Sequence, residues 1–152
     1  MRVGQKIRWP RREGKRKRLT RAQKWVVYLS VVVLGLGSAN VGRAGVALTY
    51  RARLPDLEMM VSWAYLAVTG GVWGAVFFAC LVGLLGFRRW GRWSTLVAVV
   101  VYEIHVWVNH LLFDANEYAR SVWPRDLALT LLLLILVWGT LNWPSVRATF
   151  KR

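Results

Sequence analysis

The sequence has few cysteines, few acidic residues and none of the usual motifs of catalysis. Cys80 is the single cysteine in 152 residues, which excludes a disulfide-stabilised scaffold and a two-cysteine redox site. Asp and Glu number seven, against 22 Lys and Arg. The sequence has no nucleophile motif and no glycine-rich phosphate loop before a helix. We therefore expect no enzymatic activity and no cofactor.

Hydrophobic residues and positive charge are abundant instead, and they occupy different segments. Hydrophobic residues make up 56% of the chain, yet its formal charge is +15. This combination excludes a disordered chain and a conventional nucleic-acid-binding globule. Four long apolar runs hold most of the hydrophobic residues, and Glu103 is the only Asp, Glu, Lys or Arg inside them: 25–42, 59–87, 93–113 and 127–146. Runs of this length predict membrane-spanning helices.

The four runs predict an all-α fold, an integral membrane four-helix bundle with a basic N-terminal tail that is disordered or partly helical. The connections are short and contain no Ser- or Pro-rich linker, so residues 25–146 form one transmembrane domain in which neighbouring helices run antiparallel. The spans are expected at about residues 22–43, 57–87, 94–114 and 125–143.

Local signals mark where three of the spans begin. The spacing of Thr20 and Gln23 is that of a capping box, which places the start of the first helix at the end of the tail. Pro55 suits the first turn of the second helix. Gly91 and Ser94 suit a tight connection and an N-cap, so the third helix is expected to begin after them.

The first 24 residues form a strongly basic tail with eleven Lys or Arg and a single acid, Glu13. Such a segment has too little apolar surface to fold alone. We expect it to contact anionic lipid headgroups, at about 1 kcal/mol for each basic residue near the surface, or only to fix the orientation of the chain. Nucleic acid is not an expected partner. Headgroup contacts are expected in the tail and in the second connection: Lys15, Arg16, Lys17, Arg18, Arg88, Arg89 and Arg92.

The basic residues also predict the orientation of the spans. The N-terminal tail, the second connection and the short C-terminal tail at 147–152 hold eleven, three and three of the 22 Lys and Arg. Lys and Arg are retained on the cytoplasmic side, so we expect a bacterial inner membrane protein with both termini in the cytoplasm. A rival interpretation takes the basic leader, residues 26–36 and the small residues 37–39 as a cleaved signal peptide, which would leave three spans.

Glu103 lies near the midpoint of the third span, where an ionisable group costs about 2.5–3.5 kcal/mol and therefore faces protein or water. At about 100° per residue, its face of the helix continues toward the outer surface. The members of this predicted polar stripe are Glu103, His110, Asp114 and Glu117. A second polar strip, expected to make intramembrane contacts, consists of Tyr102, His105 and Asn109.

Two interpretations of Glu103 remain open. It is the deepest site of a proton or cation path that enters from outside, or it is hydrogen-bonded to a neighbouring group and holds the helices together. The candidate partners for the second interpretation are Ser62, Thr69, Thr130 and Tyr102. A metal or haem site is not expected, because Glu103 and His105 point to different sides of the helix and no second span offers His or Cys ligands in a suitable pattern.

Small residues recur every four positions in the second span. This small-residue stripe predicts close helix packing, because small side chains let backbones approach where the hydrophobic effect gives no help. Its members are Ala67, Gly71, Ala75, Ala79 and Gly83, and Gly70 and Gly74 widen it. The pattern does not say whether the contact is internal or with a partner. The first span is expected to pack against it through small residues of its own, Gly35, Gly37, Ser38, Ala39 and Gly42. The leucine-rich segment 131–136 of the fourth span is then left for lipid or a partner helix.

Residues 87–150 contain the segments Arg-Arg-Trp-Gly-Arg-Trp, Tyr-Glu-Ile-His and Trp-Pro-Arg-Asp, followed by a leucine run. In these features the chain resembles small uncharacterised four-span bacterial membrane proteins, which implies the fold and location given above and no particular activity. We expect a non-enzymatic accessory or assembly subunit that binds another membrane protein or a second copy of itself. The alternative is a small proton- or cation-coupled transporter or channel that uses Glu103.

Overall fold

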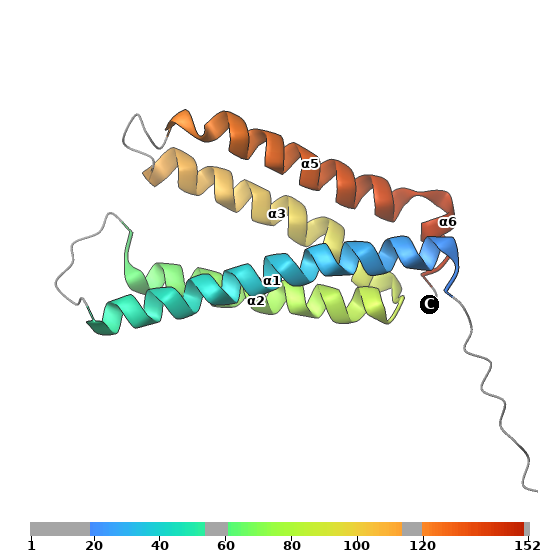
Figure 1. Cartoon of the computed structure of the whole chain (residues 1–152), viewed down its shortest axis with the longest axis horizontal. Helices are drawn as coiled ribbons and strands as arrows, with labels where there is room; N and C mark the ends of the chain where they lie inside the picture. Colours follow the sequence, from blue (N-terminus) through green and yellow to red (C-terminus); the bar gives the residue numbers. More distant parts are fainter. Residues whose placement is uncertain (1–18, 54–60, 114–119, 151–152) are drawn as a thin grey trace, which may run out of the picture.

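The structure, a computed structural model, describes residues 19–53, 61–113 and 120–150. Within these ranges the chain is helical and contains no β-strand, which confirms the all-α class. Four helices are long and apolar enough to cross a membrane. The helices, shown in Figure 1, are α1 (Arg21–Arg53), α2 (Trp63–Leu85), α3 (Arg89–Phe113), α5 (Trp123–Asn142) and the short α6 (Pro144–Arg147).

α1 begins at the expected capping box and continues well beyond the expected end of the first span. The backbone N–H of Gln23 donates to Thr20 Oγ1 at 3.2 Å, and the N–H of Thr20 donates to Gln23 Oε1 at 2.9 Å. The helix has 33 residues, a length of about 50 Å, whereas the prediction ended the span at residue 43. This length exceeds the thickness of a hydrocarbon core, which is about 30 Å.

α2 starts later than the sequence predicts. Ser62 is its N-cap and accepts a hydrogen bond from the N–H of Ala64 at 3.3 Å. An unbroken helix from residue 57 to 87 is therefore wrong at its beginning, because Ser62 is not helical. Pro55 lies outside the described residues.

α3 starts earlier than predicted, because the chain turns at residues 86–88. The N–H of Arg88 donates to the carbonyl of Gly83 at 3.0 Å, and that of Phe87 to the carbonyl of Leu84 at 2.9 Å, the hydrogen-bond pattern of a Schellman turn. Phe87 has φ 48°, a left-handed conformation that a glycine usually supplies. Its ring lies 6.4 Å from that of Phe150, a contact that helps to hold this turn.

Gly91 and Ser94 consequently lie inside α3 rather than before it. The Ser94 hydroxyl donates to the Gly91 carbonyl at 3.2 Å, within the same helix. Gly91 is instead a packing residue: a Cβ placed on it would lie 2.5 Å from the Cα of Gly83. The backbones of α2 and α3 therefore touch where these two glycines meet.

α1 and α2 pack together, through the two glycines that widen the predicted small-residue stripe rather than through its five members. A Cβ on Gly70 would meet the carbonyl oxygen of Asn40 at 2.7 Å, and one on Gly74 would meet the side chain of Val41 at 2.5 Å. By contrast, a Cβ on Gly71 would have nothing within 4 Å. Four predicted members of the stripe are not buried: Ala67 is half-buried, and Gly71, Ala75 and Ala79 are exposed.

As a contact with α1 the five-residue stripe is too long: Gly70 and Gly74, themselves four apart, make the close approach, but five positions at that spacing do not stay on one face. Each step of four residues rotates the position by about 40°, so five positions in series wrap nearly halfway round the helix. A spacing of seven rotates by only about 20°. The buried residues Gly70, Phe77 and Leu84 follow that spacing. On α1, a Cβ at Gly35 or Gly42 would likewise have nothing within 4 Å, whereas one at Gly37 would meet Phe77 Cβ of α2 at 3.4 Å, as the prediction expects of this residue.

The helices form two hairpins, α1 with α2 and α3 with α5, which converge at one end and separate at the other (Figure 1). We call the converging end, with the α2–α3 turn and α6, the basic end, and the other the open end. The shared core comes from the halves of the helices nearest the basic end: Val26, Leu29, Val33, Phe77, Cys80, Leu84, Leu96, Val99, Val137 and Leu141. A four-helix core therefore fills only half of the bundle among the described residues.

Candidate functional site

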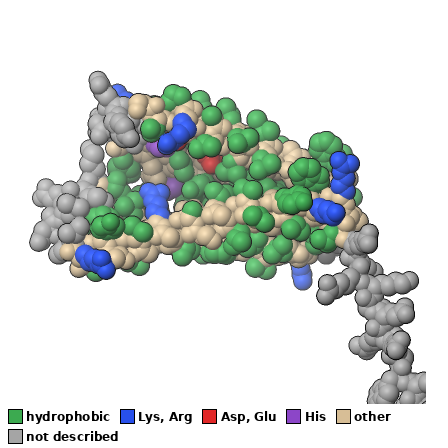
Figure 2. Space-filling model, in the orientation of Figure 1, with side chains coloured by type: hydrophobic (Ala, Val, Ile, Leu, Met, Phe, Trp, Pro, Cys, Tyr) green, Lys and Arg blue, Asp and Glu red, His purple; other side chains and the backbone are tan. Residues whose placement is uncertain are grey.

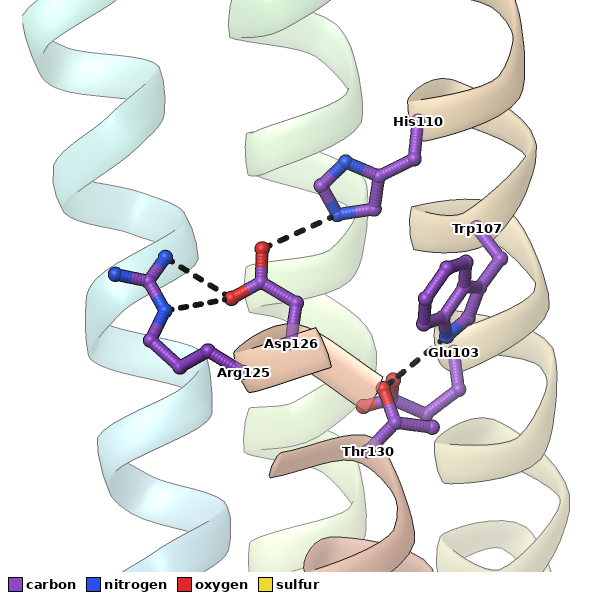
Figure 3. Close-up of polar contacts among 6 residues, drawn as sticks. All are labelled: Glu103, Trp107, His110, Arg125, Asp126 and Thr130. Atoms are coloured by element: carbon purple, nitrogen blue, oxygen red, sulfur yellow. Dashed lines mark hydrogen bonds and ion pairs between the residues drawn. The ribbon is translucent and has the colours of Figure 1, made fainter. Parts of the chain in front are cut away.

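Glu103 lies between α3 and α5 and is 8% exposed. The hydroxyl of Thr130, on α5, donates to Glu103 Oε2 at 2.6 Å. The indole N–H of Trp107 donates to the same hydroxyl at 3.2 Å (Figure 3). Glu103 thus contacts one of its four candidate partners. A carboxyl, a hydroxyl and an indole together tie the middle of α3 to α5.

The other candidate partners make different contacts. The hydroxyl of Thr69 donates to the carbonyl of Tyr65 within α2 at 2.7 Å. The hydroxyl of Ser62 caps α2. The hydroxyl of Tyr102 accepts from Asn40 Nδ2 on α1 at 3.4 Å.

His110 lies farther along the same face of α3 and faces Asp126 of α5. The distance from His110 Nε2 to Asp126 Oδ2 is 3.8 Å. Asp126 also pairs with Arg125, whose Nη2 lies 2.9 Å from Asp126 Oδ1 (Figure 3). Asp114 and Glu117, the outer members of the predicted stripe, lie outside the described residues. The stripe therefore reaches across to α5 through Asp126, which inspection of the third span alone does not show.

Trp107 lies between the Glu103 and His110 contacts in Figure 3. Its ring centroid is 5.5 Å from that of His110 and 6.1 Å from that of Trp123 on α5. The two polar contacts are thus separated by a cluster of aromatic rings. In the part of the stripe that the structure describes, Glu103 and His110 each take part in a contact with α5.

The second strip faces α2 and α1. The hydroxyl of Tyr65 donates to Asn109 Oδ1 at 2.8 Å, and Asn109 Nδ2 lies 3.0 Å from His105 Nε2. Trp73 packs beside the strip, with its ring centroid 5.1 Å from that of Tyr102 and 5.8 Å from that of His105. Tyr102, His105 and Asn109 thus take part in the contacts of α3 with the α1–α2 hairpin. The partners Tyr65 and Asn40 did not figure in the sequence prediction, although both are polar residues inside apolar runs.

Arg92 is buried, unlike Arg88 and Arg89 beside it. It is 6% exposed. Its Nε donates to the carbonyl of Leu141 at 2.9 Å and its Nη2 to Asn142 Oδ1 at 2.7 Å. Both acceptors are at the C-terminal end of α5, where carbonyl groups lack helical partners. Arg88 and Arg89 are exposed, and Lys15, Arg16, Lys17 and Arg18 lie outside the described residues.

The described residues contain no group of three or more His, Cys, Asp or Glu side chains that could hold a metal ion. Cys80 is buried, and its thiol lies 3.7 Å from the hydroxyl of Ser94.

No family model, curated protein or solved structure matches the chain. The resemblance of residues 87–150 to four-span bacterial membrane proteins therefore stays a prediction.

Proposed function

We propose that this protein is a non-enzymatic accessory or assembly subunit of a membrane complex, set in a bacterial inner membrane with both termini in the cytoplasm. The placement of the polar side chains supports this proposal. Glu103 and Thr130 join α3 to α5, and Tyr65 and Asn109 join α2 to α3. Polar groups used in this way stabilise a bundle in lipid. They give the chain a fixed shape that another subunit recognises.

The observation that carries the proposal is the exposure of α5. Val137 and Leu141 are the only buried residues of this helix, and both lie near the basic end. The remainder presents large apolar side chains, with Leu132 63% and Ile135 70% exposed. Figure 2 shows such side chains over most of one face of the molecule, with Lys and Arg toward the two ends.

Contact with lipid does not stabilise the packing of α5 on the other helices, because lipid tails are as apolar as leucine. Helix association in a membrane depends on close packing and hydrogen bonds instead. α5 makes few of these contacts within the described chain. We propose that a transmembrane helix of another subunit packs on the leucine-rich face of α5 and completes the open half of the bundle.

Charge supports the proposed orientation. The basic end carries Arg88, Arg89 and Arg147, and α1 begins there, at Arg21. On the cytoplasmic side, the basic tail meets the anionic headgroups of the inner leaflet. In our proposal the tail thereby holds the subunit at the membrane surface where its partner is assembled.

Purification from native membranes in mild detergent tests the proposal. We expect the wild-type protein to migrate as a complex and the double variant L132A/I135A to be released from it, because that variant removes two large side chains from the α5 face. The control V72A/V82A truncates two comparably exposed side chains of α2, 55% and 67% exposed, and should stay in the complex. A strictly monomeric wild-type protein with no co-purifying subunit would contradict the proposal, whereas a complex containing only this chain would identify the partner as a second copy.

One observation favours the alternative function, a proton- or cation-coupled transporter. Glu103 is an ionisable group in the middle of a span, and the only hydrogen bond to its carboxyl from the described residues comes from Thr130. Transport requires this carboxyl to exchange protons with water on both sides in turn. An interhelical contact requires only that the side chain accept the Thr130 hydrogen bond.

A further inference from the structure

A cavity of about 770 Å³ opens at the basic end, between the start of α3 and the segment that follows α5. Its lining is rich in basic, aromatic and amide side chains, including Arg89, Trp90, Arg92, Trp93, Asn142 and Arg147. Arginines from two distant parts of the sequence, α3 and α6, therefore border one space. Its volume lies within the range of small-molecule sites, about 300–1,000 Å³.

Among the described residues, the three arginines have no acidic partner nearby. No Asp or Glu occurs in residues 59–102 or 127–152, and both ion pairs of the described chain are at Asp126, toward the open end. Arg147 and Arg89 repel the charge of Arg92. Gathering like charges on a partly desolvated surface is unfavourable unless an anion joins them.

Arg92 is held in a fixed orientation. Its two hydrogen bonds to Leu141 and Asn142 immobilise one side of the guanidinium group, and the group lies 4.8 Å from the centroid of the Trp93 ring. A guanidinium group has five N–H donors, of which these bonds use two within the described chain. The three remaining N–H donors are on a side chain that is already fixed in place. Arg92 therefore loses little conformational freedom when it binds an anion.

We propose that this cavity binds a phosphate group, and that an anionic phospholipid headgroup supplies it. Arginine guanidinium groups match phosphate oxygens in charge and in hydrogen-bond geometry. Trp90 and Trp93 border the cavity and are 49% and 57% exposed, as expected of indole rings that lie at headgroup level. A free phosphate ion could make the same hydrogen bonds to the arginines, but it has no apolar part to contact the exposed indole rings.

This site differs from the diffuse attraction of the basic tail. It requires Arg89 and Arg147 together, and α6 brings Arg147 beside α3 only when the chain folds. Arg88, next in sequence, does not line the cavity. Binding should therefore depend on which arginines are removed and not on the number removed.

Native mass spectrometry of the full chain in a neutral detergent tests the proposal, with short-chain phosphatidylglycerol, phosphatidylcholine and inorganic phosphate as separate probes. We expect phosphatidylglycerol to bind about tenfold more tightly than phosphatidylcholine, and R89Q/R147Q to weaken phosphatidylglycerol binding by about tenfold. The matched control R21Q/R88Q removes two charges from the same end without touching the cavity lining, and should bind as the wild type does. Circular dichroism checks that both variants keep the helical fold.

Equal binding of the two lipids would overturn the proposal, since the cavity would then have no preference for an anionic headgroup. Equal weakening in the two double variants would also overturn it, since that result means that charge alone attracts the lipid. Inorganic phosphate that binds with the same dependence on Arg89 and Arg147, together with no preference for phosphatidylglycerol, would overturn the lipid source and support the phosphate chemistry.

Discussion

Replacing Gly91 by alanine is expected to destabilise the fold by about 3 kcal/mol, at the upper end of the range for overpacking. The added Cβ would lie 2.2 Å from the carbonyl carbon of Gly83 and 2.5 Å from its Cα. These are backbone atoms, so relief requires α2 and α3 to move apart. Separation would break the turn at residues 86–88 and pull Arg92 away from α5. Unfolding by SDS in mixed micelles, followed by tryptophan fluorescence, measures the change.

Gly139→Ala is the control for this experiment. Gly139 also lies within a helix, α5, but a Cβ there would have nothing within 4 Å. Alanine is the better helix former by about 0.5–1 kcal/mol, so this variant should be as stable as the wild type or more so. Equal stability of G91A and wild type would show that the α2–α3 backbones do not touch.

The second large effect is expected at two adjacent glycines of α2, with opposite signs. A Cβ on Gly70 would meet the carbonyl oxygen of Asn40 at 2.7 Å and the backbone nitrogen of Ala44 at 3.0 Å. We expect Gly70→Ala to destabilise the protein by about 2 kcal/mol. Gly71 faces open space, and Gly71→Ala should stabilise it by up to about 1 kcal/mol. The same SDS titration compares the two variants directly.

This pair also tests which face of α2 contacts α1. The four-residue pattern of small side chains places Gly71 at the contact, whereas the structure places Gly70 there. A larger loss of stability in G71A than in G70A would reverse this assignment. The two variants differ by one position and carry the same added methyl group. Any difference between their stabilities therefore reflects position and not composition.

The sequence predicts the number and type of the helices well, because long uncharged runs and the capping box at Thr20 are local signals. It misplaces the start of α3, since Gly91 looks like a turn residue and Phe87 does not. The left-handed conformation of Phe87 accompanies a contact with Phe150, which is distant in sequence. The conformational preferences of single residues therefore place this turn at Gly91, whereas it lies at Phe87.

In the candidate site too, local sequence signals predict some features and miss those that depend on distant contacts. Helical periodicity is enough to predict that Glu103 is turned toward protein and that Thr130 is among its candidate partners. It does not predict Trp107 as the bridge or Asp126 as the residue facing His110, because these contacts depend on how α5 lies across α3. Likewise Arg92 looks like a surface residue in sequence, and its burial depends on where α5 ends.

The separation of the hairpins links the fold to the proposed function. The described core residues shared by all four spans lie near the basic end, so the open half depends on polar contacts such as those of Glu103 and Asn109. A partner helix on α5 would add apolar packing where the chain itself has least. The basic end has its own core, which allows the phosphate cavity to form independently of a partner.

Our central claim is that the polar side chains inside the spans bind helix to helix and do not carry ions, and Glu103→Gln tests it most directly. The glutamine oxygen still accepts the Thr130 hydrogen bond, so we expect a stability change below about 1 kcal/mol. Thr130→Val removes the donor, leaves Trp107 without its acceptor and should cost about 1–3 kcal/mol.

The decisive measurement is proton flux into liposomes driven by a potassium diffusion potential and followed with an internal pH-sensitive dye. We predict that wild-type and E103Q proteoliposomes show the same flux as protein-free liposomes. A wild-type flux that disappears in E103Q, while the variant keeps its stability, would contradict the claim and make Glu103 the coupling site of a transporter.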